Sequence, residues 1–229
     1  MGPKQPSPPG PVREARAAIL LGNRDRAWSV LTAALEDPDA DRAPLLALRT
    51  EILIHRGEWV AARADLEEAL ALRDDHASWW NNLSFVLHHL KEYAGALEAR
   101  NRALALSVAR RGADHPKVLR ATADRAWSHV ALGDLDAAEA DLRAAAEGLA
   151  DTNEVRWYAQ ALDQLGIFLL KSRHRAADAL ECFDRRDALE IKASIILGGQ
   201  VLREGFDPKE KRIFAANRAA AVQALEGEN

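Results

Sequence analysis

The sequence predicts an all-α protein, an α-solenoid of about five antiparallel helix pairs followed by a C-terminal capping helix. Its 229 residues are rich in the strong helix formers Ala, Leu, Glu and Arg, and only two Tyr and five Phe are available for sheet. A short block of residues also recurs, beginning at Gly22, Gly57, Lys91 and Gly133, at intervals of 35, 34 and 42 residues. Each block separates two apolar-periodic stretches of helical length. Such periods indicate stacked helix pairs, each burying its apolar face against a neighbour.

The chain begins with a segment that is too rich in proline for a helix, so residues 1–11 are predicted to be a flexible leader. A helical repeat domain is predicted over residues 12–197. Its first repeat is degenerate before Ile19, but Gly22 and Ala27 keep the second half recognisable.

The second block shows the repeat scheme in detail. A helix over residues 43–54 carries one apolar stripe at spacings of three and four, formed by Leu45, Leu46, Leu48, Ile52 and Leu53. Gly57 then suits a tight turn, because it has no β-carbon. A second helix runs from Trp59, and the small side chains of Ala62 and Ala69 let the two helix axes approach closely.

The third block repeats this scheme, and the pattern resembles the tetratricopeptide repeat family. That family combines an aromatic residue, a leucine and a small residue on the first helix with an aromatic residue and two alanines on the second. Here these positions hold Trp80, Leu83, Ser84, Tyr93, Ala96 and Ala103. The resemblance covers roughly residues 12–192 and implies a right-handed solenoid. Thr50 and Ser84 stand where the family prefers glycine, and Lys91 replaces the turn glycine.

The longer interval before Gly133 resembles the 42-residue variant of kinesin-light-chain-like repeats. This resemblance implies a second helix lengthened by about two turns after Ala103, and Pro116 fits an early position of the next helix. A fifth pair is predicted over about residues 153–191, with a turn near Ser172 that lacks glycine.

The C-terminal region is predicted to be a cap. Glycines interrupt the helical pattern after residue 197, and Asp207 with Pro208 then offers an N-cap and first-turn pair for a last helix reaching about Leu225. A terminal repeat needs a polar outer cover to stay soluble. Residues 198–229 are therefore expected to form a capping helix and tail.

The bulk composition argues against several classes of partner. With 31 basic and 35 acidic residues the net charge is −4, which disfavours nucleic acid because binding it normally needs a basic excess. No stretch reaches 18 uninterrupted apolar residues, so no membrane span is expected. The N-terminus lacks the apolar core of a signal peptide, and a single cysteine, Cys182, cannot form an internal disulfide. A cytoplasmic location is expected.

No catalytic or metal chemistry is predicted, and no cofactor. Seven histidines occur, but without a metal-binding motif or a cysteine pair. Zinc needs ligands within about 2.3 Å, whereas packed helices are spaced by about 10 Å. Cys182 lies beside Phe183 in an apolar helix and is expected to be a buried thiol. The sequence has neither a nucleophile elbow nor a phosphate loop, so an enzyme is not expected.

In the tetratricopeptide family the first helices build a concave groove, and the alignment places Glu51, Phe85, Trp127 and Ile167 at equivalent inward positions. An apolar floor with a mixed polar rim suits an extended peptide or an amphipathic helix. The predicted partner-binding residues are Phe85, Trp127, Ile167, His55, Asn81, Asn82, His88, His89, Arg120 and Lys171. The alternative is that the chain's own tail, or the curvature of the solenoid, covers Phe85 and Trp127.

One specific use of the family, the carboxylate clamp for chaperone peptides, is disfavoured. Its slots require Lys, Asn, Asn, Lys and Arg, and here they hold Ala47, Glu51, Asn82, Arg120 and Asp124. Two acidic residues would repel a carboxylate ligand. The sequence therefore predicts a non-enzymatic scaffold or adaptor that binds a protein or peptide partner. A self-associating homo-oligomeric repeat protein is the alternative, ahead of an enzyme and of a helical-repeat RNA binder.

Overall fold

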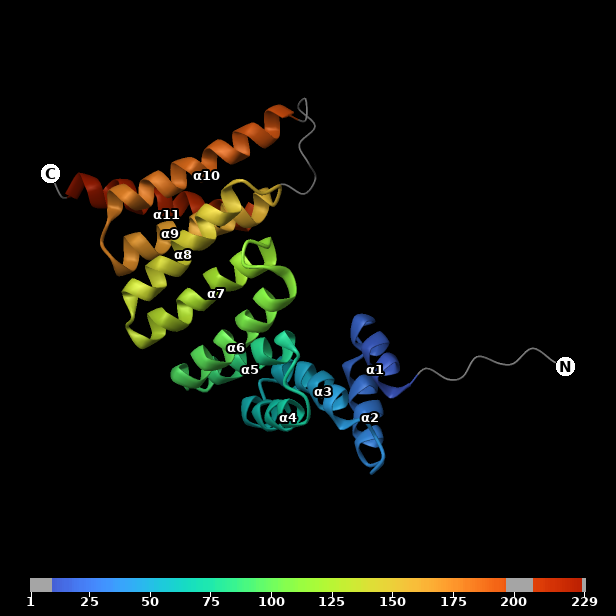
Figure 1. Ribbon diagram of the computed structural model, residues 1–229. Helices are drawn as coiled ribbons and strands as arrows, with labels where there is room; N and C mark the ends of the chain where they lie inside the picture. Colours follow the sequence, from blue (N-terminus) through green and yellow to red (C-terminus); the bar gives the residue numbers. More distant parts are fainter. Residues whose placement is uncertain (1–9, 197–207, 228–229) are drawn as a thin grey trace. The chain divides into compact units, whose positions relative to one another are not determined.

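The computed structural model describes residues 10–196 and 208–227, which form eleven α-helices and no strand (Figure 1). The predicted all-α solenoid class is confirmed. Most of the predicted leader, the glycines after residue 197 and Asp207 lie outside the described residues. The chain divides after Leu106 into two compact units, which we call unit 1 and unit 2.

Unit 1 is built from consecutive helices that pack on one another in chain order. It contains α1 (Pro11–Leu20), α2 (Arg24–Leu35), α3 (Arg42–Arg56), α4 (Trp59–Leu72), α5 (Ala77–His89) and most of α6 (Tyr93–Arg111), whose last residues belong to unit 2. The helices predicted over residues 43–54 and from Trp59 are therefore confirmed. Ala62 and Ala69 are completely buried, as expected for positions where two helices approach closely.

The turns of the second, third and fourth helix pairs share one backbone geometry. Gly57 and Gly133 each end a first helix in the left-handed region, with φ of 74° and 80°. Lys91 occupies the same position in the third repeat and has a φ of 64°. In each turn the next N–H donates to a carbonyl five residues earlier, as from Glu92 to Leu87 at 2.9 Å. The predicted turn at Lys91 therefore forms, although its side chain has a β-carbon.

Unit 2 contains the remaining helix pairs and the last helix. Its helices are α7 (Pro116–Leu132), α8 (Leu135–Ala150), α9 (Val155–Ser172), α10 (Ala176–Ile196) and α11 (Pro208–Gly227). Pro116 is the first residue of α7, as predicted. The long second helix of the third repeat is also confirmed, because α6 has 19 residues and α4 has 14. The helix α10 continues to Ile196, five residues beyond the expected end of the fifth pair.

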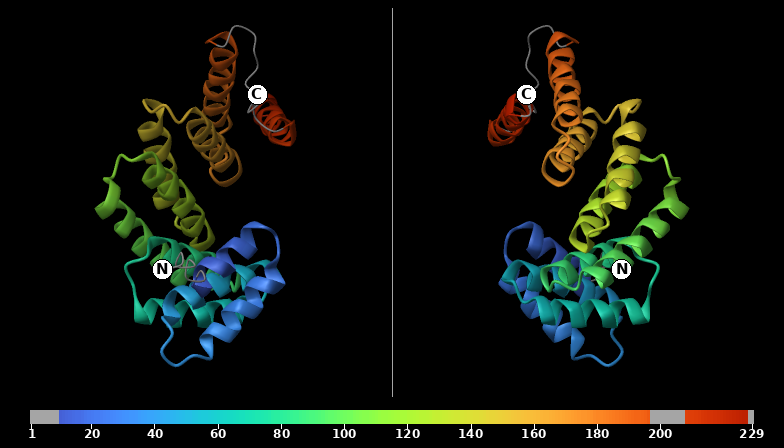
Figure 2. Two further views of the ribbon diagram at one scale, coloured as in Figure 1. Left: turned by 90° about the vertical axis from the view of Figure 1, so that its right-hand side faces the viewer. Right: turned by 90° about the vertical axis from the view of Figure 1, so that its left-hand side faces the viewer.

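The last helix of unit 2 lies along the final pair. Helix α11 contacts α10 and α9 and buries Phe214 and Ala221 (Figure 2). The ring of Phe214 meets that of Phe183 edge-on, with centroids 5.6 Å apart. The buried guanidinium of Arg186 lies 3.9 Å from the centroid of the Phe214 ring. These contacts attach α11 to the final helix pair.

Close packing in unit 2 depends on one helical glycine. A β-carbon on Gly166 of α9 would lie 2.6 Å from the ring of Phe183 on α10, which is too close for any real contact. Phe183 is itself completely buried. The absence of a side chain at Gly166 therefore sets the distance between α9 and α10.

Candidate partner-binding surfaces

The first candidate surface consists of one stripe of side chains on α7 and one on α9 of unit 2, and we call these two stripes the α7–α9 groove. These are the first helices of successive pairs, and they contact each other. On α7, Arg120, Asp124 and Trp127 follow at spacings of four and three and so share one stripe. On α9 the corresponding stripe contains Gln160, Gln164, Ile167 and Lys171. One end of the groove is a cleft of about 290 Å³, lined by Arg120, Ala123, Asp124, Leu149, Trp157, Gln160, Ala161, Asp163 and Gln164.

The cleft is flanked by a cation held over an aromatic ring. The guanidinium carbon of Arg120 lies 5.2 Å from the centroid of the Trp157 ring. Such cation–π contacts are worth about 0.5–1 kcal/mol when exposed, and they leave the guanidinium donors available for a partner. Arg120 is exposed and Trp157 is half-buried against the core of the unit. The Arg120 guanidinium is therefore held in place beside the apolar ring of Trp157.

The remaining part of the groove is more apolar. Trp127 and Ile167 are both half-buried, and Ile167 packs against the core while part of its side chain stays accessible. Lys171 is exposed one turn beyond Ile167. Of the four residues of unit 2 that the sequence predicted as partner-binding, Arg120 lines the cleft, and Trp127, Ile167 and Lys171 lie further along the same two helix stripes.

Local sequence signals hold α7 in place. The imidazole of His115 accepts a hydrogen bond from the Lys117 N–H at 3.1 Å and so caps the helix that Pro116 begins. Arg125 bridges α7 to α8 through two hydrogen bonds to Asp141, of 2.8 and 2.6 Å. This hydrogen bonding raises the pKa of Arg125 further above its ordinary value, so the guanidinium stays charged.

The second candidate surface is an aromatic cluster in unit 1 formed by Trp59, Phe85 and His89. The rings of Trp59 and His89 stack in parallel with centroids 4.0 Å apart. Phe85 meets both edge-on, at 6.0 Å from Trp59 and 4.6 Å from His89. Phe85 nevertheless remains 44% exposed. The cluster therefore fixes an accessible apolar ring on the face of α5.

The other predicted residues of unit 1 have different environments. His88 is exposed and meets the Tyr93 ring edge-on at 5.2 Å, whereas His55 is exposed at the end of α3. Asn81 accepts a hydrogen bond from Arg100 at 3.3 Å, and Asn82 is half-buried.

Comparison with known proteins identifies the repeat. Residues 75–151 match the family model described as tetratricopeptide repeat. These residues are tetratricopeptide repeats. No curated protein matches the sequence closely enough to count as a relative.

Solved structures extend this likeness to most of the chain at the level of fold. BtubC (BKLC) from P. vanneervenii has a TM-score of 0.67 at 16% identity, covering 94% of this chain and 82% of the other. TPR-like repeats of kinesin-light-chain type from Podosopora anserina have a TM-score of 0.68 at 16% identity, covering 82% and 99%. YrrB, described as a TPR protein with an unusual peptide-binding site, has a TM-score of 0.61 at 19% identity, covering 82% and 88%.

The tetratricopeptide fold is in general a protein-interaction fold. Within residues 10–196 and 208–227, no group of three or more His, Cys, Asp or Glu side chains is arranged to hold a metal ion. No helix in that part of the chain is long and apolar enough to cross a membrane. Cys182 is 6% exposed, and burial raises the pKa of its thiol, which confirms the predicted buried thiol.

Several residues of the candidate surfaces were not predicted from the sequence. Trp157 and Gln160 lie on the same face of α9 as Gln164, at seven and four residues before it, so helical spacing was a usable signal. Trp59 belongs to a second helix and was expected only to fill space beside its turn. Its stacking on His89 depends on how two tetratricopeptide repeats pack, which no spacing within one repeat reveals.

Proposed function

We propose that the protein is a non-enzymatic scaffold that binds a segment of a partner protein in the α7–α9 groove. The observation that carries this proposal is the alignment of two apolar side chains, Trp127 and Ile167, between cations at Arg120 and Lys171 on adjacent first helices. A partner with apolar side chains and an acidic group at the Lys171 end complements this arrangement, whereas Asp124 and Asp163 disfavour a second acidic group at the Arg120 end. The peptide-binding site of YrrB, a structural neighbour, supports the use of such a fold for peptides.

Each groove residue has a role that follows from its environment. Trp127 and Ile167 act as apolar anchors, because aromatic and large apolar groups at the centre of an interface carry most of its free energy. Arg120 is pre-oriented on Trp157, so it loses less side-chain entropy when it binds a partner carboxylate or carbonyl. Lys171 adds long-range attraction for an acidic segment.

The aromatic cluster of unit 1 is proposed as a second contact surface. Phe85 is accessible yet fixed by Trp59 and His89, so it can enter an apolar pocket of a partner with little loss of freedom. Exposed rings that are not mobile are typical of interaction surfaces.

We further propose that this scaffold acts as an adaptor in the cytoplasm. Its one cysteine is a buried, reduced thiol, so the fold does not depend on an oxidising compartment. Its acidic balance supports protein rather than nucleic-acid partners.

The proposal is tested with peptides selected from a displayed random library on the full chain. We expect enrichment of apolar peptides with an acidic group on one side, and Trp127→Ala should weaken binding by about 2 kcal/mol, roughly 30-fold, in fluorescence anisotropy. Ile213→Ala is the matched control, because Ile213 is an exposed apolar residue on α11. Unchanged affinity in a Trp127→Ala protein with native circular dichroism would refute the groove, and a loss of helicity would make Trp127 a core residue.

A further inference from the structure

The α7–α9 groove has two chemically different ends. Short turns reverse the chain before and after α8, so α7 and α9 run in the same direction, and their N-terminal halves meet at the cleft of about 290 Å³ (Figure 1). The other end lies towards the C-termini of both helices, where Trp127 and Ile167 are followed by the exposed Lys171. A partner segment bound along the groove therefore meets different side chains in its two possible directions.

Hydrogen-bond donors are concentrated at the cleft end. Within the described residues the guanidinium of Arg120 makes no ion pair, and the side-chain amides of Gln160 and Gln164 make no hydrogen bond. Asp124 and Asp163 line the same cleft, so a carboxylate of the partner is disfavoured there. The group that fits these donors is a neutral acceptor, such as a backbone carbonyl.

The positions of these donors favour a helical partner over an extended one. An extended segment exposes N–H and C=O groups along its whole length and needs partners for them throughout the groove. Beyond the cleft, Trp127 and Ile167 contribute one indole N–H and no acceptor. A helix satisfies its own backbone except at its termini, where the last carbonyls lack a partner. It therefore needs apolar contacts along the groove and donors at one end only.

The same donors set the direction of such a helix. Its last carbonyls reach Arg120, Gln160 and Gln164 only if its C-terminus lies at the cleft, and the partial negative charge of that terminus suits an exposed cation. Its N-terminus then lies beside Lys171, which attracts the acidic side chains that stabilise a first turn. From Gln160 to Lys171 the groove is about 16 Å long, which corresponds to about three turns of the bound helix.

We infer that the partner segment is an amphipathic helix bound antiparallel to α7 and α9, with an acidic first turn at Lys171 and its last turn at Arg120. This binding mode rests on the proposed function of the α7–α9 groove and adds the conformation and the direction of the partner. Apolar side chains at spacings of three and four contact Trp127 and Ile167. The antiparallel direction also sets the dipole of the partner helix against those of α7 and α9, which is favourable.

The helical conformation is tested with synthetic peptides of about 18 residues, acetylated and amidated at their ends. The forward peptide has glutamates in its first turn and leucines at spacings of three and four in a background of alanine and glutamine. A second peptide differs only by a central proline, which breaks a helix. Fluorescence anisotropy with the full chain should show at least about tenfold weaker binding of the proline peptide. Difference circular dichroism should show that the forward peptide gains helix when bound.

The direction is tested by a charge exchange that does not depend on the helicity of the peptide itself. Lys171→Glu should weaken binding of the forward peptide about tenfold. A peptide with lysines in its first turn should instead bind Lys171→Glu about tenfold more tightly than it binds the wild type. Lysines in the last turn should give no such preference for the variant. If the last turn gives the preference and the first turn does not, the inferred direction is wrong.

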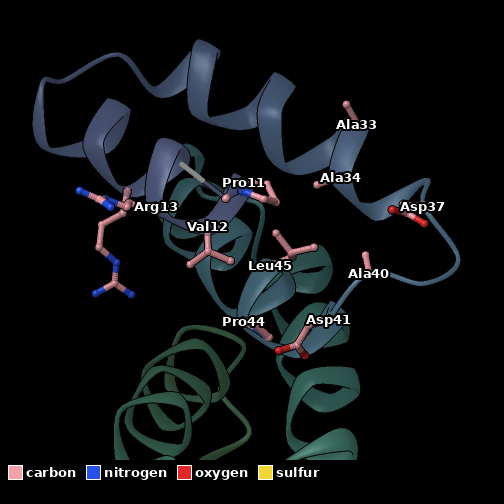
Figure 3. A pocket seen from close by; sticks show the side chains of 12 residues that line it. Pro11, Val12, Arg13, Ala33, Ala34, Asp37, Ala40, Asp41, Pro44 and Leu45 are labelled. Atoms are coloured by element: carbon pink, nitrogen blue, oxygen red, sulfur yellow. The ribbon is translucent and has the colours of Figure 1, made fainter. Parts of the chain in front are cut away.

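A matched control is available in a second cleft, which lies in unit 1 between α1, the end of α2 and the start of α3 and has a volume of about 780 Å³. Figure 3 shows Arg13 on the α1 side of this cleft and Asp37 and Asp41 on the side of the α2–α3 loop. Arg13 is exposed near the start of a helix, as Arg120 is, and makes no ion pair within the described part of the chain. Arg120→Gln should weaken the forward peptide about fivefold, whereas Arg13→Gln should leave its affinity unchanged.

The results distinguish a wrong binding mode from a wrong function. The helical partner is refuted, and the groove stands, if library-selected peptides bind in a manner that depends on Trp127 but gain no helix. Equal binding of the forward and proline peptides, or no binding of the forward peptide, refutes the helical partner in the same way. If Trp127→Ala changes the binding of no peptide, the proposed function of the groove fails, and the inferred binding mode fails with it.

Discussion

The guanidinium of Arg49 on α3 donates two hydrogen bonds of 2.7 Å each to the carboxylate of Asp65 on α4. Arg125 and Asp141 repeat this contact between α7 and α8. Both pairs are separated by 16 residues, and both aspartates are buried. The two pairs therefore occupy equivalent positions in the second and fourth repeats.

In the third repeat the equivalent two positions hold uncharged residues. Displacing Arg49 and Asp65 by the repeat interval of 34 residues leads to Leu83 and Ala99, which are both buried. A large cation with a small anion in one repeat is thus replaced by a large apolar residue with a small one in the next. The two positions therefore combine one large and one small side chain in each repeat, whether or not these are charged.

This equivalence predicts that a single substitution in the Arg125–Asp141 pair destabilises the protein more than a double substitution does. Asp141→Ala alone should lower the free energy of unfolding by about 3 kcal/mol, because it leaves the partly buried Arg125 without its carboxylate. The double change Arg125→Leu/Asp141→Ala, copied from the third repeat, should lie within about 1 kcal/mol of the wild type. Urea unfolding followed by circular dichroism measures both. A double variant as unstable as the single one would contradict the equivalence.

A second prediction concerns the close approach of α9 and α10. Gly166→Ala should destabilise the protein by about 1–3 kcal/mol, because the new methyl group must displace the buried Phe183 ring. Gly95→Ala on α6 is the matched control, since its β-carbon would meet Leu87 at an ordinary 3.4 Å. The control should stabilise by up to about 1 kcal/mol through helix propensity. Equal effects in thermal melts would count against the packing argument.

The turn of the third repeat predicts a stabilising change. Lys91 holds a left-handed backbone with a φ of 64°, which costs about 1 kcal/mol for a residue with a β-carbon. Lys91→Gly should therefore raise the free energy of unfolding by about that amount, in spite of glycine's greater freedom when unfolded. The reciprocal change Gly57→Lys should destabilise the second repeat. A stabilising Gly57→Lys would show that the turn geometry is not responsible.

The buried thiol predicts slow chemical modification. Cys182 is shielded from solvent, and burial raises the pKa of its thiol, so both access and the thiolate fraction are low. At mildly alkaline pH an aromatic disulfide reagent should react with the folded protein at least about tenfold more slowly than with the protein in urea. Similar rates in both conditions would indicate that α10 opens freely.

The environment of Glu139 in unit 2 predicts that the free energy of unfolding falls at acidic pH. Burial alone would raise the pKa of this carboxyl, but hydrogen bonds and charges from Arg143 and Arg175 hold its pKa below the ordinary value. Its contribution to stability is therefore complete above about pH 4.3 and is lost as the pH falls through the lower folded pKa.

Glu139→Gln isolates that contribution. The variant should show a shallower fall of unfolding free energy between about pH 5 and pH 3, because it removes a group that takes up a proton on unfolding. Measurements of urea unfolding at several pH values give the slope. Identical slopes for the variant and the wild type would exclude Glu139 as a source of acid sensitivity.

Local signals in the sequence predicted most of the fold. Gly57, Gly133 and Pro116 act through backbone conformation alone, so the turns and the start of α7 follow from residue type. The expected end of the fifth pair near residue 191 was too early, because α10 continues to Ile196, two residues before the glycines at positions 198 and 199.

The candidate surfaces were predicted only in part, for a related reason. Aligning repeats placed Trp127 and Ile167 correctly on first helices, since helical period fixes the face of a residue. The contact of Arg120 with Trp157, and that of Trp59 with His89, join residues from different repeats. Such pairs depend on how one helix pair rests on the next, and this distance is set by packing rather than by the period.

The Arg49–Asp65 and Arg125–Asp141 pairs each close inside a single helical hairpin. Copying or deleting one whole hairpin would therefore strand neither member of a pair. Insertion or deletion of the second or the fourth hairpin as a whole therefore leaves neither of these two buried aspartates without its arginine.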